Sequence, residues 1–331
     1  MKLRSEALLF LGKRVFRTFS KLKIEPKTLN IFLAIILTDN YKQTTDHYKM
    51  DISNKKHFLT VKDHSVSKEI FELYHDEELD MLITHPQPDL DVLGKYYESE
   101  DYISHTDNKR SLFEKAYHFV KGIALKNKLN LINSEQTAKG RILDIGAGTG
   151  DFLTVAKNNG WQTVGIEPSD RAKGIAINKG ISFVENTAAL ENHSFDVITM
   201  WHVLEHIPDL DFQIKELKRL LKPTGTLIVA VPNFKSFDAN YYKEFWAAYD
   251  VPIHFWHFSK KAIQSLFQKE AIKLEKVLPM KFDSFYVSLL SEKYKNGKMN
   301  FLKAFFIGLQ SNWKAKRNLE YSSHIYVLKN N

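Results

Sequence analysis

One loop constrains the fold of this chain more than any other feature. Residues 141–152 read RILDIGAGTGDF, a short apolar run ending in an acid, followed by Gly146, Gly148 and Gly150. Such a turn between a first strand and a helix lets backbone N–H groups approach a ligand closely, because no Cβ intervenes. A dinucleotide fingerprint would need a glycine at Asp151, and a P-loop would need a lysine there. The loop therefore predicts another kind of ligand.

From Gly140 onward, short apolar runs alternate with segments of helical pattern. Apolar strands separated by helices predict βαβ units and a parallel sheet covered on both faces. We expect a doubly wound α/β fold with a mostly parallel, seven-stranded sheet whose last strand is antiparallel. Ser259 is the expected N-cap of a helix over 259–271. The expected strands lie at 141–145, 162–166, 181–184, 195–200, 226–231, 272–278 and 324–328.

The sequence divides into three parts. We expect a basic, helical N-terminal extension over 1–62, a mixed or helical lid region over 63–137, and a Rossmann-like domain over 138–331. This domain carries an aromatic, basic insertion, 280–321, in which 293–317 holds seven basic and no acidic residues. Long insertions of this kind usually form lids or partner surfaces.

The net charge of +8 lies in the extension. Residues 1–62 hold 13 Lys and Arg against 5 Asp and Glu, so the rest of the chain holds 34 of each sign. The body therefore has no overall electrostatic attraction for nucleic acid, and we expect none as a partner. The absence of cysteine excludes disulfides, thiolate metal sites and a cysteine nucleophile, which makes a cytoplasmic location the default.

Residues 1–24 fit a basic amphipathic helix. The pattern favours either peripheral contact with an anionic membrane surface or docking of the helix on the body. The apolar run is too short for a signal peptide, and IFLAIIL at 31–37 is far below the roughly 20 residues of a spanning helix. The apolar stripe comprises Leu8, Leu11, Val15, Phe19 and Leu22, with Lys13, Arg14, Arg17 and Lys21 roughly opposite.

The second apolar run also ends in an acid, Glu167. A carboxylate here can accept hydrogen bonds from both hydroxyls of a ribose, by the logic that places an acid about 20 residues after a dinucleotide loop. Asp151 begins the helix after the loop, where its charge would repel a pyrophosphate. A nucleoside without phosphates fits both observations.

Five motifs together resemble the class I S-adenosylmethionine-dependent methyltransferases, above all the subgroup that includes the ubiquinone-type O-methyltransferases. They are ILDIGAGTGDF, GIEPS, FDVITMWHVLEHI, LKPTGTLIVAVPN and DVPIHFWHFS. The resemblance covers 138–331 and, more loosely, the chain from about residue 63. It implies S-adenosylmethionine as the methyl donor, S-adenosylhomocysteine as the product, and a small-molecule acceptor methylated at oxygen.

The resemblance also implies a cofactor site along the ends of the first four strands. Its amino-acid end would lie at the glycine-rich loop, its ribose at the acid of GIEPS, its adenine near the turn after the third strand, and its sulfur near the end of the fourth. For two of these positions, the third glycine and the tryptophan, packing alone is the alternative. The expected cofactor-binding residues are Asp144, Gly146, Gly148, Gly150, Glu167, Pro168, Asn186, Trp201 and His202.

Three histidines after the fourth and fifth strands are candidates for a general base. Loops at the carboxyl ends of parallel strands converge on the ligand, and a hydroxyl acceptor must lose a proton during methyl transfer. Histidine titrates close to neutral pH. We expect His254 to be the base, screened by neighbouring aromatic residues and oriented by Asp250, with His202 and His257 as the other candidates. For His257, capping of the following helix is the alternative.

We expect no metal site. HVLEH at 202–206 matches a zinc-protease pattern, but Pro208 and the preceding strand do not suit the helix which that pattern needs. The resemblance does imply metal ligands in this turn, although His202 stands where an acid would be expected. A requirement for Mg²⁺ at Glu205 and His206 therefore stays open.

Two other functions also stay open. The chain could bind the cofactor without catalysis and recruit a partner through 280–321. It could instead methylate RNA, which the basic run 293–317 favours, although no N-P-P-Y tetrad follows the fourth strand. The sequence does not specify the acceptor, because acceptor specificity resides in loops and not in the fold, nor does it specify the oligomeric state.

Overall fold

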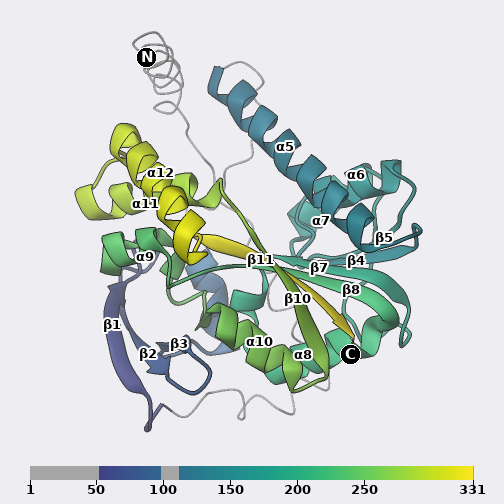
Figure 1. Ribbon diagram of the computed structural model, residues 1–331, viewed down its shortest axis with the longest axis horizontal. Coiled ribbons are helices and arrows are strands. Elements are labelled where there is room, and N and C mark those ends of the chain that lie inside the picture. The colour runs from purple at the N-terminus through teal and green to yellow at the C-terminus, as the bar shows by residue number, and fades with distance from the viewer. Residues whose placement is uncertain (1–51, 98–111, 331) are drawn as a thin grey trace.

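The computed structural model describes residues 52–97 and 112–330. Its centre is a seven-stranded sheet in the order β10-β11-β8-β7-β4-β5-β6 (Figure 1). Neighbours from β8 to β6 pair in parallel, while β11 is antiparallel to both β8 and β10. The expected seven-stranded, mostly parallel sheet with an antiparallel last strand is confirmed. Its strands are β4 (Arg141–Ile145), β5 (Gln162–Ile166), β6 (Ser182–Phe183), β7 (Phe195–Trp201), β8 (Leu221–Pro232), β10 (Ile272–Pro279) and β11 (Ser323–Asn330).

Helices cover both faces of this sheet (Figure 1). On one face, α5 (Leu112–Glu135), α6 (Asp151–Asn158) and α7 (Asp170–Asn178) form a core cluster that includes Ile132, Leu153 and Ala176. On the other face, α8 (Leu210–Leu220) and α10 (Lys260–Gln268) contribute to a larger cluster. The central strands are apolar on both sides because neither face meets water.

Side-chain caps fix where these helices begin. Ser259 accepts a hydrogen bond from the backbone N–H of Ala262 at 3.1 Å, which confirms it as the N-cap of α10. Ser169 and Asp209 cap α7 and α8 in the same way. Each cap satisfies an N–H group that would otherwise lack a partner in the first turn.

The first described part of the chain, 52–85, forms a small antiparallel sheet, so the expectation of a helical N-terminal extension is wrong there. β1 (Lys56–Lys62), β2 (Ile70–Asp76) and β3 (Met81–His85) pair in sequence, and β9 (Trp256–His257) adds a fourth strand from the larger domain. The acidic residues of this segment are typical of a loop, but one of them makes the turn of a hairpin. Asp76 accepts from the Leu79 N–H at 2.9 Å, and such an Asx turn favours a hairpin. The amphipathic segment 1–24 lies outside the described residues.

Short helical segments complete this region and the loops around the sheet. In the N-terminal region, α4 (Leu90–Leu93) and η2 (Gly94–Tyr97) follow β3. In the larger domain, η3 (Leu204–His206) follows β7. Three segments follow β8: α9 (Phe237–Tyr242), η4 (Lys243–Phe245) and η5 (Ala247–Tyr249). The expected division at 62/63 stays a prediction, but β1 and β2 pair across it.

The insertion forms a hairpin of two helices, α11 (Asp283–Asn296) and α12 (Phe301–Asn318). They approach closely at Gly308, where a Cβ would lie 2.7 Å from the Phe285 ring. The rings of Phe285 and Phe305 stack with centroids 5.6 Å apart. Among the described residues, no helix is both long and apolar enough to cross a membrane.

Candidate active site

The glycine-rich loop joins β4 to α6, and its three glycines all have positive φ. Two of them are required by packing: a Cβ at Gly146 would lie 2.4 Å from Val203, and one at Gly150 would lie 2.7 Å from Ala176. At Gly148 a Cβ would meet no described heavy atom within 4 Å. Packing thus accounts for the first and third glycines, and open space for a ligand remains beside Gly148.

Glu167, the acid at the end of β5, lies against this loop. Its two carboxylate oxygens accept from the backbone N–H groups of Gly148 at 2.6 Å and of Ser169 at 2.8 Å. Burial raises the pKa of Glu167, although these two bonds favour the charged form. Because a carboxylate has about four lone-pair sites, two stay available for a ligand.

Asp144 ends β4 beneath the loop and is 2% exposed. Its carboxylate accepts from the hydroxyl of Thr199 on β7 at 2.5 Å. Burial raises the pKa of Asp144 to about 7, against the effects of the Thr199 bond and the Lys128 charge.

Lys128 on α5 belongs to this site, and the sequence analysis missed it. Its Nζ lies 4.1 Å from the centroid of the Trp201 ring. Burial lowers the pKa of Lys128 to about 8, while Asp144 and Asp283 favour its charged form. No motif surrounds Lys128; the only available signal was its place on the helix that precedes the glycine-rich loop.

Trp201 ends β7 and packs edge-to-face on Phe152, with ring centroids 5.7 Å apart. Its Nε1 is buried without a hydrogen-bond partner among the described residues. Buried indole N–H groups usually have one. Packing therefore explains the ring but not the orientation of its polar edge.

The expectation that the charge of Asp151 would repel a pyrophosphate is wrong. Asp151 forms ion pairs with Lys121 at 2.7 Å and Lys179 at 2.8 Å. Against the effect of burial, these partners and Thr149 lower the pKa of Asp151. Because the two ammonium groups offset its charge, Asp151 does not by itself repel an anion.

Pro168 and Asn186 lie on the turns after β5 and β6. Pro168 is buried beside Glu167. The side-chain oxygen of Asn186 accepts from the Ala188 N–H at 3.0 Å, and Arg219 donates to the Thr187 carbonyl at 2.9 Å. These bonds fix the turn, and contact with an adenine stays a prediction.

His202 follows β7 in a strained backbone conformation with φ +57°. Its Nδ1 lies 3.4 Å from Glu205, and its Nε2 lies 3.1 Å from Asp283 at the start of α11. Burial alone would lower the pKa of His202, but Asp283 and Glu205 outweigh it and raise this pKa to about 10. A ring that is protonated at neutral pH cannot accept a proton, which argues against His202 as the base.

His254 has the opposite character. Its Nδ1 lies 3.0 Å from the carbonyl oxygen of Ala248, which fixes Nδ1 as the donor and leaves Nε2 as an acceptor. The residue is 7% exposed, and burial lowers its pKa. The lowered pKa agrees with the expected neutral ring. The ring is oriented by the Ala248 carbonyl, whereas the side chain of Asp250 was expected to orient it.

His257 lies on β9, the fourth strand of the small antiparallel sheet. Thr84 on β3 donates its hydroxyl proton to the His254 carbonyl at 2.6 Å, so its oxygen accepts from His257 Nε2 at 3.1 Å. Burial holds the pKa of His257 well below its usual value. Its ring thus has a structural role within the small sheet, where it links β9 to β3, and Ser259, not His257, caps α10.

Glu205, His206 and His254 form a buried cluster beside these histidines. One ligand atom from each lies within 4.8 Å of the other two, and the two imidazole rings are 4.5 Å apart. His206 Nδ1 contacts the Ile253 carbonyl at 3.0 Å and the Tyr97 hydroxyl at 3.2 Å. Burial, followed by the neighbouring His254, lowers the pKa of His206 to about 3.

The Glu205 carboxylate is 1% exposed and has no hydrogen bond among the described residues beyond its ion pair with His202. Burial would raise its pKa, but the surrounding histidines lower it. This acid and the two neutral rings could hold a divalent cation. From the sequence, Glu205 and His206 are open candidates for Mg²⁺, but no motif places His254 beside them.

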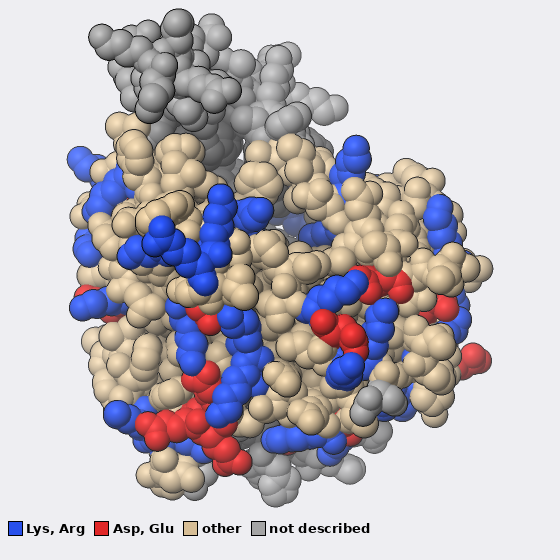
Figure 2. Space-filling view, viewed as in Figure 1, with Lys and Arg blue, Asp and Glu red and all other residues tan. Residues whose placement is uncertain are grey.

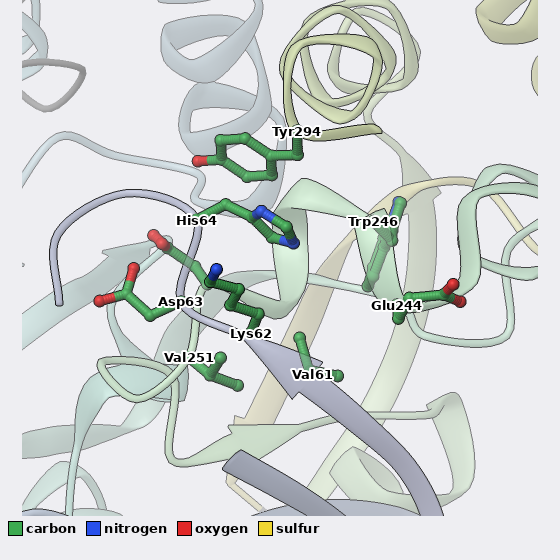
Figure 3. Close-up of a pocket in the computed structure, with 9 residues that line it drawn as sticks. Val61, Lys62, Asp63, His64, Glu244, Trp246, Val251 and Tyr294 are labelled. Atoms are coloured by element: carbon green, nitrogen blue, oxygen red, sulfur yellow. The ribbon is translucent and has the colours of Figure 1, made fainter. Parts of the chain in front are cut away.

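A separate small pocket lies where β1 meets the segment 244–251 (Figure 3). His64 stacks on Tyr294 there, with ring centroids 4.9 Å apart. The residues that line it belong neither to the glycine-rich loop nor to the histidine cluster. It is therefore not the site defined above.

The fold and this loop define a doubly wound α/β protein with an acid at the end of its second central strand. A family model described as "Methyltransferase domain" matches residues 102–271, about half of the chain. The chain belongs to this family, as its motifs predict. It is a member of the S-adenosylmethionine-dependent methyltransferases.

Curated relatives include ubiquinone biosynthesis O-methyltransferases. That of Actinobacillus pleuropneumoniae serotype 7 is 35% identical over 131 residues, covering 34% of this chain and 56% of the relative. That of Paraburkholderia phymatum is 33% identical over 117 residues, covering 32% and 50%. The chain thus spans about half the length of the curated relatives it matches.

Solved structures of methyltransferases are also similar. An S-adenosylmethionine-dependent methyltransferase from Thermotoga maritima is 21% identical with a TM-score of 0.45, covering 66% of this chain and 95% of that one. Phosphoethanolamine N-methyltransferase 2 from Haemonchus contortus is 19% identical with a TM-score of 0.42, covering 62% and 52%.

Proposed function

We propose that this protein transfers a methyl group from S-adenosylmethionine to a hydroxyl oxygen of a small molecule, with His254 as the base. The observation that carries the proposal is the state of His254: buried, neutral, and with a free Nε2 because Nδ1 is engaged by Ala248. The relatives' name, O-methyltransferase, supports oxygen as the accepting atom.

The residues around the loop fit the methyl donor. Open space beside Gly148 and two free lone-pair sites on Glu167 suit the ribose. Asp144 and Lys128 offer one group of each sign, which suits the ammonium and carboxylate of the amino-acid end. S-adenosylmethionine would supply an activated methyl group on a sulfonium, so the protein has chiefly to align the acceptor and remove its proton.

The proton step falls to this chain's own groups. His254 Nε2 would accept the acceptor's hydroxyl proton, while the Ala248 carbonyl holds the required tautomer. The Glu205 carboxylate, whose charge raises the pKa of His254, would stabilise the imidazolium that forms. His202, protonated and held by Asp283 and Glu205, would border the site without taking the proton.

A divalent cation on the histidine cluster is the second candidate arrangement. The specific observation in its favour is the convergence of Glu205, His206 and His254 within 4.8 Å. Two hard-ligand oxygens and two imidazoles suit Mn²⁺ or Zn²⁺ better than Mg²⁺. In that case His254 would be a ligand and could not act as the base.

The test is transfer of the labelled methyl group of S-adenosylmethionine to a panel of phenols and catechols, before and after treatment with a chelator. We expect a labelled O-methyl product that survives chelation. Binding of the donor without any product would favour the non-catalytic alternative, and label in RNA would favour RNA methylation. Activity lost on chelation and restored by a cation would favour the metal arrangement.

A further inference from the structure

The α11–α12 hairpin carries an unusual concentration of exposed apolar side chains. Nine of the seventeen exposed large hydrophobic residues among the described ones lie within 282–319. Single exposed apolar residues are normal, but a contiguous group marks an interaction site. We call the group formed by Tyr286, Leu302, Phe305, Phe306, Leu309 and Trp313 the hairpin face.

Helical geometry places these residues of α12 on one side. Leu302, Phe305, Phe306, Leu309 and Trp313 fall within an arc of about 100° at 100° per residue. The opposite side of α12 is buried through small residues, including Ala304, Gly308 and Ala315. The side of α12 that faces the protein is thus already buried. The hairpin face is a second apolar stripe, on the exposed side of this helix.

The N-terminus of α11 extends the hairpin face. Asn312 donates to the Lys281 carbonyl at 2.9 Å, so the start of α11 lies beside the C-terminal half of α12. Phe282, the N-cap residue of α11, and Tyr286 within it are four residues apart, and both are exposed. The apolar surface therefore spans both helices.

Basic side chains border this surface. The segment 293–317 has seven basic and no acidic residues, and blue side chains gather over the upper left of Figure 2, where Figure 1 draws α11 and α12. The Arg317 guanidinium lies 4.4 Å from the Trp313 ring centroid. Both acids on the two helices have partners: Glu292 is buried and paired with Lys303 at 3.0 Å, and Asp283 is paired with His202 at 3.1 Å.

We propose that the hairpin face binds the surface of an anionic lipid bilayer. A helix with an apolar stripe of Leu, Phe and Trp and a basic border lies in the bilayer interface, with its apolar side chains among the acyl chains and its cations at the head groups. Lys and Arg stems can reach past apolar neighbours to place their charges in water.

Charge argues against the other occupants. Residues 1–51 hold 10 Lys and Arg and 5 Asp and Glu, so this segment is basic like the hairpin. A second copy of the hairpin would meet like charge as well. Single-stranded RNA would stack on aromatic rings, but Leu302 and Leu309 offer no such surface.

The position of the hairpin connects the bilayer to the candidate site. Phe282 directly precedes Asp283, whose carboxylate reaches His202 Nε2 at 3.1 Å. An apolar acceptor dissolved in the bilayer would thus meet the site at the edge of the hairpin. This consequence rests on the proposed function, whereas bilayer binding itself does not.

The test is sedimentation of the full chain with vesicles of phosphatidylcholine containing about 30% phosphatidylglycerol, without any methyl donor. We expect binding that falls in about 0.5 M NaCl. F306S combined with W313S should weaken it about 10-fold or more. The matched control, I175S with I177S on α7, also replaces two exposed apolar residues and should bind like the unaltered protein.

Circular dichroism should show both variants folded, because all four side chains are exposed. Unchanged vesicle binding by the F306S/W313S variant would overturn the proposal. So would loss of binding only when Lys13, Arg14 and Arg17 of the extension are changed to Glu. Salt-sensitive binding of poly(U) in place of vesicles, lost in the F306S/W313S variant, would replace the bilayer with RNA.

Discussion

The glycine-rich loop and the histidine cluster both follow carboxyl ends of central strands, but they are built in different ways. The loop presents backbone groups of consecutive residues, and Glu167, at the end of the next strand, accepts from one of them. The cluster takes its side chains from η3 and the loop before β9, and Tyr97 of η2 contacts its His206 across 109 positions of the chain. Under the proposed function, the local loop would bind the methyl donor, and the long-range side-chain cluster would act on the acceptor.

This difference predicts two separable kinds of variant. Changes at the loop should weaken donor binding and leave the chemical step unaltered at saturation. Changes at the cluster should slow the chemical step and leave donor binding unaltered. A variant that does both would break the comparison.

The largest effect is expected for His254→Ala. Without its base the protein should lose about 10² to 10⁴-fold in turnover, while donor affinity stays within a factor of a few. Steady-state rates from pH 6 to 9 and calorimetry measure the two quantities. His57→Ala, at an exposed histidine on β1 that pairs with Glu72, is the control; near-normal turnover of His254→Ala would remove His254 from the chemistry.

Glu167→Ala should weaken donor binding by roughly 1.5 to 3 kcal/mol, since two charge-assisted hydrogen bonds to the ribose are lost. Calorimetry with S-adenosylhomocysteine measures the loss. The exposed Glu185, paired with Lys173 at 3.3 Å, provides Glu185→Ala as a control of equal charge. An unchanged affinity in Glu167→Ala would place the ribose elsewhere.

Asp144→Asn should stabilise the donor-free protein at alkaline pH. The folded pKa of about 7 lies above the unfolded value, so the folded state binds the extra proton and stability falls as pH rises from about 4 through 7. Asparagine removes this loss and can still accept from Thr199. We expect a gain of about 1 to 3 kcal/mol at pH 8 and little at pH 4, measured by denaturant unfolding; a gain that is equal at both values would contradict the burial of this charge.

The smallest effect concerns His202. Because the pKa of His202 is raised, its ion pairs stabilise the folded protein fully below about pH 6.5, and this stabilisation is lost as pH rises through about 10. The contribution to the free energy of unfolding is small, since 36% of the side chain is exposed. Asp283→Asn should lower this pKa, which NMR titration of the ring protons measures. Titration of His202 below pH 7 in the unaltered protein would show that the ion pair with Asp283 does not form.

Sequence patterning predicted most of the fold. The seven strands, the antiparallel last strand and the Ser259 cap follow from apolar periodicity and helix-capping chemistry. The fourth strand of the small sheet was missed because β9 is only two residues long and pairs with β3 from far away in the chain. Such pairings leave no local signal.

The candidate site was predicted unevenly for the same reason. Gly148 and Glu167 follow from motif spacing, since each is fixed by its own strand end. Lys128 was missed because its position depends on how α5 packs over Trp201. The state of His202 depends on Asp283, 81 residues further along the chain, which no spacing could reveal.

Hydrogen exchange on the full chain tests the separation of the two regions most directly. On adding S-adenosylhomocysteine, we expect slower exchange in peptides that cover 146–150 and 167–169, because the donor site contacts their backbone. Peptides that cover 253–257, beside the histidine cluster, should exchange as before. Protection of 253–257 without protection of the loop would contradict the account.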